Sequence, residues 1–132
     1  MEFVPLEEPN KIIVYYHAPC CDGIVGAWCA YRTLKGTATY IGIEPDKRIS
    51  LDDITKDNIL YFIDVLPTRE LDAVCLKAKR VIVIDHHKTN GTYLAFVRQH
   101  KNLELQFDLG RSGCQLAWDH FNPGKERPWF VD

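Results

Sequence analysis

Four short apolar runs constrain the fold of this chain more than any other feature of its sequence. They cover residues 12–16, 39–43, 59–63 and 81–84 and are rich in β-branched and aromatic residues. Each run is continuous rather than alternating, which is typical of strands buried on both faces of a sheet. A weaker run at residues 103–107 indicates one more strand.

Helical patterns separate these runs. Residues 23–34 place Ile24, Trp28 and Tyr31 at helical spacing, which predicts a helix that buries this face and ends at Gly36. A second helix is expected after Thr68 as its N-cap, and a third from about residue 112 to residue 121. Alternating strands and helices predict one α/β domain, a Rossmann-like parallel sheet with helices on both faces.

Charge, hydropathy and cysteine usage exclude several classes of protein. With 16 Lys and Arg against 18 Asp and Glu, the chain lacks the basic surplus of a general nucleic-acid coat. It has no apolar run of the roughly 20 residues that span a bilayer, so no membrane partner is expected. The five cysteines, two of them adjacent, are typical of a reducing compartment. We therefore expect a soluble cytoplasmic protein.

Side chains that can ligate metals gather where the runs end. They are His17, Cys20 and Asp22 after the first run, Asp64 after the third, and Asp85, His86 and His87 after the fourth. In open parallel sheets, ligands bind at the carboxyl ends of the strands. Imidazole and carboxylate ligands suit Mn²⁺, Mg²⁺ or Fe²⁺. Taken singly, Asp22 could equally well be a helix N-cap, and adjacent histidines are commonly surface residues. The convergence of three strand ends favours a metal site instead.

The same residues resemble the DHH phosphoesterase superfamily, which includes family II inorganic pyrophosphatases, single-strand-specific exonucleases, oligoribonucleases and cyclic-dinucleotide phosphodiesterases. The resemblance rests on Asp85-His86-His87 after a buried strand, on His17-x-x-Cys20-x-Asp22-Gly23, and on the strand-end Asp64. The segment at residues 111–114 also resembles family members known only as predicted phosphohydrolases. The resemblance implies metal-dependent hydrolysis of a phosphoester or phosphoanhydride.

The resemblance also implies a ligand set for one or two Mn²⁺ or Mg²⁺ ions. His17 would ligate one ion, Asp64 would bridge two, and Asp22 and His86 would hold the second. Cys20 stands where the family usually carries an aspartate, and it is interpreted either as a softer ligand that alters metal preference or as a small buried thiol.

The same resemblance assigns catalytic roles to two residues, and the affinity of helix N-termini for anions suggests a phosphate-binding group. Asp85 would orient a neighbouring ligand, and His87 would face the scissile phosphate. Ser112, Gly113 and the first amides of the last helix are candidates to bind phosphate, with Arg111 as a charged clamp. For Ser112 an ordinary N-cap is the competing interpretation. The expected substrate is a phosphorylated small molecule, a nucleotide or a short oligonucleotide.

Family members carry a fourth acidic motif after a segment like residues 127–131, followed by a C-terminal substrate-binding domain. The sequence ends at Asp132, so residues 1–132 are interpreted as a single DHH-type domain that lacks both. A catalytically weak or inactive module that binds a metal, a nucleotide or a partner protein is the alternative. A redox protein acting through Cys20 and Cys21 is disfavoured, because adjacent cysteines lack Cys-x2-Cys geometry. The sequence is also compatible with a homodimer.

Overall fold

The computed structural model describes residues 10–45, 47–88 and 100–132 of the chain. The elements follow one another as β1 (Ile12–His17), α1 (Cys21–Leu34), the 3₁₀ turn η1 (Lys35–Thr37), β2 (Ala38–Ile43), β3 (Ile59–Ile63), α2 (Leu71–Lys77), β4 (Arg80–Asp85), β5 (Leu103–Phe107) and α4 (Gly113–Phe121). The sequence after Lys88 also predicts a polar loop, but residues 89–99 lie outside the described residues.

The five strands form one parallel sheet in the order β2-β1-β3-β4-β5, which confirms the expected α/β class. The chain moves from β1 outward to β2 and then returns to the other side of β1 to build β3. The strand order therefore reverses between β1 and β3. In open α/β sheets, this reversal opens a crevice at the carboxyl ends of the two strands.

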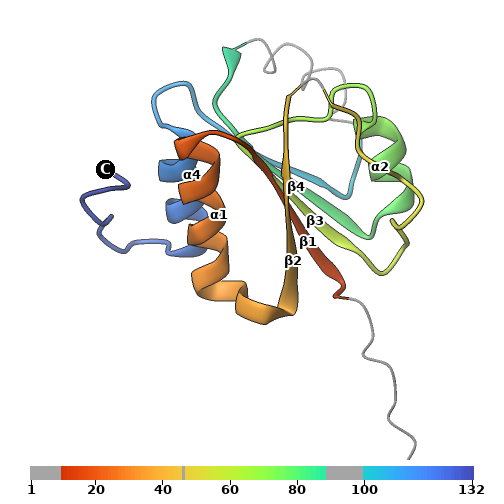
Figure 1. The fold of residues 1–132 in the computed structure, drawn as a ribbon, viewed down its shortest axis with the longest axis horizontal. Coiled ribbons are helices and arrows are strands. Elements are labelled where there is room, and N and C mark those ends of the chain that lie inside the picture. Colours follow the sequence, from red (N-terminus) through yellow and green to blue (C-terminus); the bar gives the residue numbers. More distant parts are fainter. Residues whose placement is uncertain (1–9, 46, 89–99) are drawn as a thin grey trace, which may run out of the picture.

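Helices cover both faces of the sheet, as the sequence predicts (Figure 1). On one face, α1 and α4 pack over a core that includes Val14, Ile82 and Ile84. On the other, α2 packs over a core that includes Phe62 and Val83. Side chains of β1, β3 and β4 enter both cores, which explains why their sequences are continuously apolar. Among the described residues, no helix is long and apolar enough to cross a membrane.

Helix α1 buries a different face from the one that its hydrophobic spacing predicts. Ile24 is 51% exposed, Trp28 38% and Tyr31 53%, whereas the buried positions are the small ones, among them Gly26 and Ala30. A Cβ on Gly26 would lie only 2.6 Å from a methyl carbon of Ile63. The helix thus approaches the sheet too closely for large side chains, so the prediction of a large apolar inner face is wrong.

Two of the three predicted helix ends are also corrected. Helix α1 ends at Leu34 and its C-cap is Lys35, with a positive φ of 48°, in place of the Gly36 that the sequence predicts. Helix α2 begins at Leu71 without a side-chain cap, because residues up to Glu70 form turns and Thr68 lies in them. Ser112 does cap α4, as predicted.

Candidate functional site

The carboxyl ends of β1, β3 and β4 bring the predicted metal ligands to one edge of the sheet. His17 is the last residue of β1, Asp64 follows the last residue of β3, and Asp85 ends β4 ahead of His86 and His87. The site lies beside the point at which the strand order reverses.

Asp64 lies at the centre of this cluster. Its side chain is 2% exposed, its Oδ2 lies 3.3 Å from His17 Nδ1, and its Oδ1 lies 2.8 Å from His86 Nε2. The thiol of Cys20 donates to Oδ2 at 3.7 Å, and His87 Nε2 lies 3.9 Å from Oδ1. Burial, and after it the charge of Asp22, raise the pKa of the Asp64 carboxyl.

The backbone at Asp64 is itself unusual. Its φ of 59° lies in the left-handed region, which aspartate enters more readily than most residues but which still carries strain. Strained backbone is concentrated at functional sites, where the surrounding structure holds it in place. The turn ends β3 and aims the carboxylate back across the strand ends.

Asp22, in the first turn of α1, joins the cluster to α4. Its Oδ2 lies 3.2 Å from His86 Nε2, and its two oxygens accept hydrogen bonds from the amides of Gly113 (2.9 Å) and Cys114 (2.8 Å). Burial acts to raise the pKa of Asp22, but the hydrogen bonds from Cys114 and Gly113 outweigh it and leave the pKa lowered. Asp22 is therefore held as a carboxylate beside His86.

Asp85 fixes the orientation of His87. The Asp85 side chain is fully buried, its Oδ1 accepts the His86 amide at 2.9 Å, and it lies 2.6 Å from His87 Nδ1. The His87 ring is 41% exposed, and its Nε2 lies on the side of Asp64, 3.9 Å from Oδ1, while Asp85 holds Nδ1. A buried carboxylate behind an imidazole sets which nitrogen carries the proton.

Two glycines let neighbouring backbone come close to the cluster. A Cβ on Gly23 would overlap the carbonyl group of His17. A Cβ on Gly113 would lie 2.7 Å from Oδ1 of Asp64 and 2.9 Å from its Cγ. No side chain fits at either position without displacing a residue of the site. The sequence motif includes Gly23, but the approach of Gly113 to a residue 49 positions earlier has no local sequence signal.

The donor atoms fit divalent metal ions. Two groups of ligand atoms each lie within 4.8 Å of one another, namely those of His17, Cys20 and Asp64 and those of Asp64, His86 and His87. Asp64 belongs to both groups, and Asp22 adjoins the second through His86. This mixture of imidazole and carboxylate with one thiol suits Mn²⁺ or Fe²⁺, and the thiol favours softer metals.

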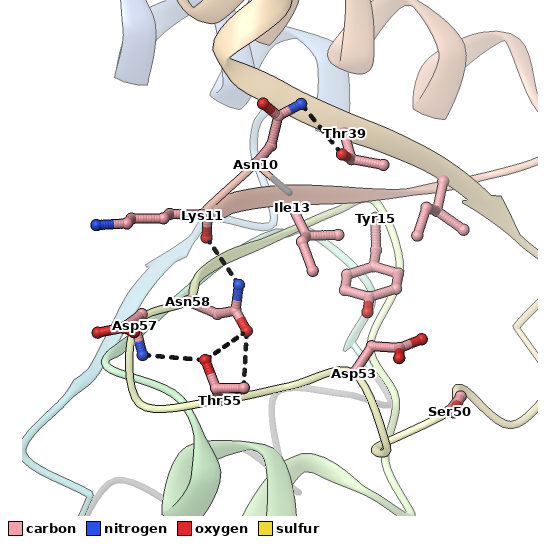
Figure 2. A pocket seen from close by; sticks show the side chains of 11 residues that line it. Asn10, Lys11, Ile13, Tyr15, Thr39, Ser50, Asp53, Thr55, Asp57 and Asn58 are labelled. Atoms are coloured by element: carbon pink, nitrogen blue, oxygen red, sulfur yellow. Dashed lines mark hydrogen bonds between the residues drawn. The ribbon is translucent and has the colours of Figure 1, made fainter. Parts of the chain in front are cut away.

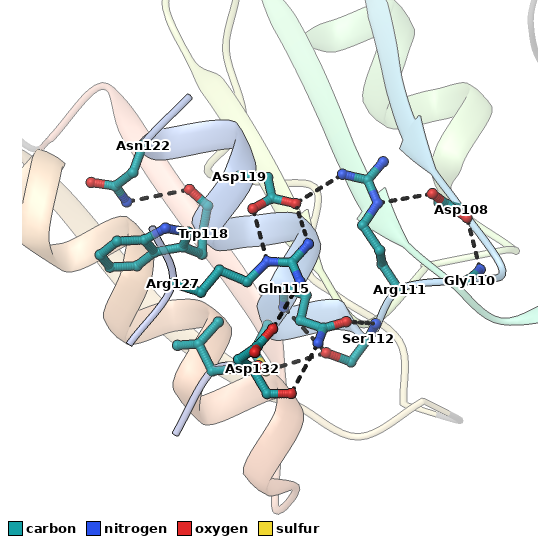
Figure 3. Close-up of polar contacts among 12 residues, drawn as sticks. Asp108, Gly110, Arg111, Ser112, Gln115, Trp118, Asp119, Asn122, Arg127 and Asp132 are labelled. Atoms are coloured by element: carbon teal, nitrogen blue, oxygen red, sulfur yellow. Dashed lines mark hydrogen bonds and ion pairs between the residues drawn. The ribbon is translucent and has the colours of Figure 1, made fainter. Parts of the chain in front are cut away.

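The residues proposed to bind phosphate are held in contacts within the protein (Figure 3). The Arg111 guanidinium donates to Asp108 at 2.8 Å and to Asp119 at 2.9 Å. The Ser112 hydroxyl accepts the Gln115 amide in a capping box, and the Gly113 amide donates to a carboxylate of the site. Phosphate binding here stays a prediction, and it requires these groups to exchange partners.

The end of the chain packs against α4 through a second group of charges, also drawn in Figure 3. Arg127 donates to both carboxylate oxygens of Asp119, at 3.1 and 2.7 Å, and to Oδ1 of Asp132 at 3.2 Å. Asp132 thus pairs with an arginine. Asp119, Arg127 and Asp132 therefore form an ion-pair network between α4 and the last described residues.

Comparison with known proteins names no family. No protein-family model and no solved structure matches the chain. The chain is similar to "Uncharacterized protein R106" of Acanthamoeba polyphaga mimivirus, with 28% identity over 133 residues, which cover 90% of this chain and 31% of the viral protein. The chain thus spans about a third of the length of that relative, whose name describes no activity.

Proposed function

We propose that this protein is a metal-dependent phosphohydrolase of the DHH type, which uses Mn²⁺ or Mg²⁺ to cleave a phosphoester or phosphoanhydride. The observation that carries the proposal is the setting of Asp64, a buried carboxylate at the end of β3 that is faced by His17 from the end of β1 and by His86 and His87 from the end of β4. Burying a carboxylate is costly unless it is paired or bound to metal. Burial raises the pKa of Asp64, and carboxylates with a shifted pKa are found often at functional sites.

The residues divide between two ions that share Asp64. His17 and Cys20 would complete the first set, and His86 with Asp22 would complete the second. Divalent ions at such a site supply charge neutralisation for phosphate oxygens and lower the pKa of bound water. The protein's own part is to hold the ligands in place, which the hydrogen bonds of Asp22 to α4 accomplish.

His87 is the residue placed to move a proton. Asp85 lies 2.6 Å from Nδ1, where a carboxylate would stabilise positive charge on the ring, and Nε2 lies on the side of the Asp64 cluster. A protonated His87 can therefore donate from Nε2 to the oxygen of the leaving group. This assignment makes Asp85 a positioning residue and His87 a catalytic one.

The test is hydrolysis of bis(p-nitrophenyl) phosphate with and without Mn²⁺. We expect turnover that requires Mn²⁺ in the wild type and in Asp52→Asn, whose side chain is exposed on a loop away from the site. We expect Asp64→Asn to lose that turnover. Hydrolysis that is independent of metal, or that survives in Asp64→Asn, would contradict the proposal.

A non-catalytic module is the second candidate function. It is favoured by one observation, namely that Arg111 and the Gly113 amide, the expected phosphate-binding groups, are already bonded to carboxylates. Such a module would bind a metal together with a nucleotide or a partner protein. Mn²⁺ binding without any turnover on nucleotides or short oligonucleotides would support it. Cytoplasmic location is part of either proposal, because all five cysteines are free thiols.

A further inference from the structure

A second cavity lies at the opposite edge of the sheet from Asp64, beside the amino ends of β1 and β3 (Figure 2). Its volume is about 560 Å³, within the range of about 300–1,000 Å³ typical of small-molecule sites. It exists because residues 44–58, which connect β2 to β3, form no helix in their described part. Among the described residues, α2 contacts β4, whereas Ile49 and Ile54 of this loop belong to the same core cluster as Tyr15 of β1.

The floor of the cavity is apolar. Ile13 and Tyr15 of β1 point to this face, and the sheet register places Thr39 and Ile41 of β2 directly beside them. The Tyr15 ring stacks on Phe62 of the neighbouring strand β3, with centroids 4.9 Å apart, which holds the ring in place beside the cavity. Ile41 is 38% exposed, which leaves apolar surface for a ligand to cover.

The Tyr15 side chain contributes a hydroxyl group to the lining of the cavity. Tyr15 as a whole is 5% exposed, and its hydroxyl makes no hydrogen bond within residues 10–45, 47–88 and 100–132. Figure 2 shows this hydroxyl turned toward Asp53 at the rim of the cavity. Burial, and after it the charge of Asp53, raise the pKa of Tyr15, so the phenol stays neutral beside the carboxylate. A phenol can donate and accept, so this hydroxyl is available to a ligand in the cavity.

Three side-chain donors that line the cavity make hydrogen bonds within the protein. The side-chain amide of Asn58 donates to the Lys11 carbonyl, the Thr55 hydroxyl donates to Asn58, and the Asn10 amide donates to Thr39. These donors are occupied within the protein. Two carboxylates remain at the rim, those of Asp53 and Asp57.

The charge balance of the cavity is therefore negative. In Figure 2 the ammonium end of Lys11 extends away from Tyr15 and Asp53, so it does not neutralise that part of the rim. A ligand that matches this cavity carries apolar surface for Ile13 and Ile41 and hydrogen-bond donors with positive charge for Asp53.

We propose that this cavity binds a small organic cation, an ammonium group on an aromatic or aliphatic body. Its apolar part lies over Ile13, Tyr15 and Ile41, and its ammonium group donates to Asp53 and to the Tyr15 oxygen. Neither contact involves a residue of the Asp64 cluster, so the proposal stands independently of the phosphohydrolase activity.

The test is calorimetric titration of the metal-free protein with three probes of one shape: tryptamine as cation, tryptophol as its neutral analogue, and indole-3-propionate as anion. We expect tryptamine to bind at least tenfold more tightly than either analogue, because a charge-assisted hydrogen bond is stronger than a neutral one. Tryptamine that fails to bind, or analogues that bind equally well, would overturn the proposal.

Variants locate the binding. Asp53→Asn, on an exposed loop, is expected to weaken tryptamine binding roughly tenfold or more, and Tyr15→Phe to weaken it about threefold. Asp52→Asn is the matched control, because it removes one charge from the same loop without touching the cavity. Equal affinity in Asp53→Asn and Asp52→Asn would place the cation elsewhere and refute the site.

Discussion

Replacing Gly113 by alanine is the most direct test of how the Asp64 carboxylate is held. The added Cβ would lie 2.7 Å from Oδ1 and 2.9 Å from Cβ and Cγ of Asp64, so the carboxylate must move by several tenths of an ångström. Asp64 is 2% exposed and has little room to move. Overpacking of a buried position costs typically about 1–3 kcal/mol, which exceeds the gain of up to about 1 kcal/mol from alanine's higher helix propensity.

We therefore expect Gly113→Ala to lower the free energy of unfolding by about 1–2 kcal/mol and to weaken Mn²⁺ binding. Denaturant unfolding of the metal-free protein measures the first effect, and calorimetric titration with Mn²⁺ measures the second. The matched control is Gly36→Ala, because a Cβ there meets nothing within 4 Å and φ is not positive. That variant should unfold and bind Mn²⁺ as the wild type does.

The reasoning is refuted if Gly113→Ala and Gly36→Ala behave alike in both measurements. A loss of stability with unchanged Mn²⁺ affinity would also count against it, because the same displacement that strains the fold moves a shared ligand. Only a loss of both stability and Mn²⁺ affinity in Gly113→Ala matches the close approach of Gly113 to Asp64 in the structure.

Three further predictions concern the site and α4. Cys20→Asp should tighten Mn²⁺ binding about tenfold in a calorimetric titration, because a carboxylate is a harder ligand than a thiol, and unchanged affinity would remove Cys20 from the ligand set. Arg127 lowers the pKa of Asp119, so the stabilisation by Asp119 is full above its unfolded pKa of about 4 and is lost as the pH falls through the lower folded value. Asp119→Asn should therefore lower the melting temperature more at pH 7 than in strong acid, and an equal deficit at both would contradict this. Ser112→Ala should lower the free energy of unfolding by about 1 kcal/mol through loss of the capping box with Gln115, and denaturant unfolding with no change would exclude that role.

The strands and the site edge were predictable because they follow from short-range pattern and a general rule. Continuous apolar runs identify buried parallel strands, and polar residues that end such runs meet at one edge of the sheet. His17, Asp64 and His86 could thus be placed together from their positions alone, and the structure brings them within hydrogen-bonding range.

Other features depend on contacts that no local pattern encodes. Hydrophobic spacing placed Trp28 inward, but α1 lies so close to Ile63 that only small residues fit beneath it. The amides of Gly113 and Cys114 bond to Asp22, more than 90 positions away, instead of remaining open for an anion. Tertiary packing decides which group each helix-end amide bonds to, and the sequence at the helix end does not predict that partner.

The central claim is that Asp64 is shared by two sets of metal ligands, and counting bound Mn²⁺ tests it most directly. In a titration followed by the electron paramagnetic resonance signal of free Mn²⁺, the wild type and the surface control Asp52→Asn should each bind one or two ions. Asp64→Asn should bind none at the same concentrations, because it removes the carboxylate common to both sets. A wild type that binds no Mn²⁺, or an Asp64→Asn protein that binds as many ions with equal affinity, would contradict the account.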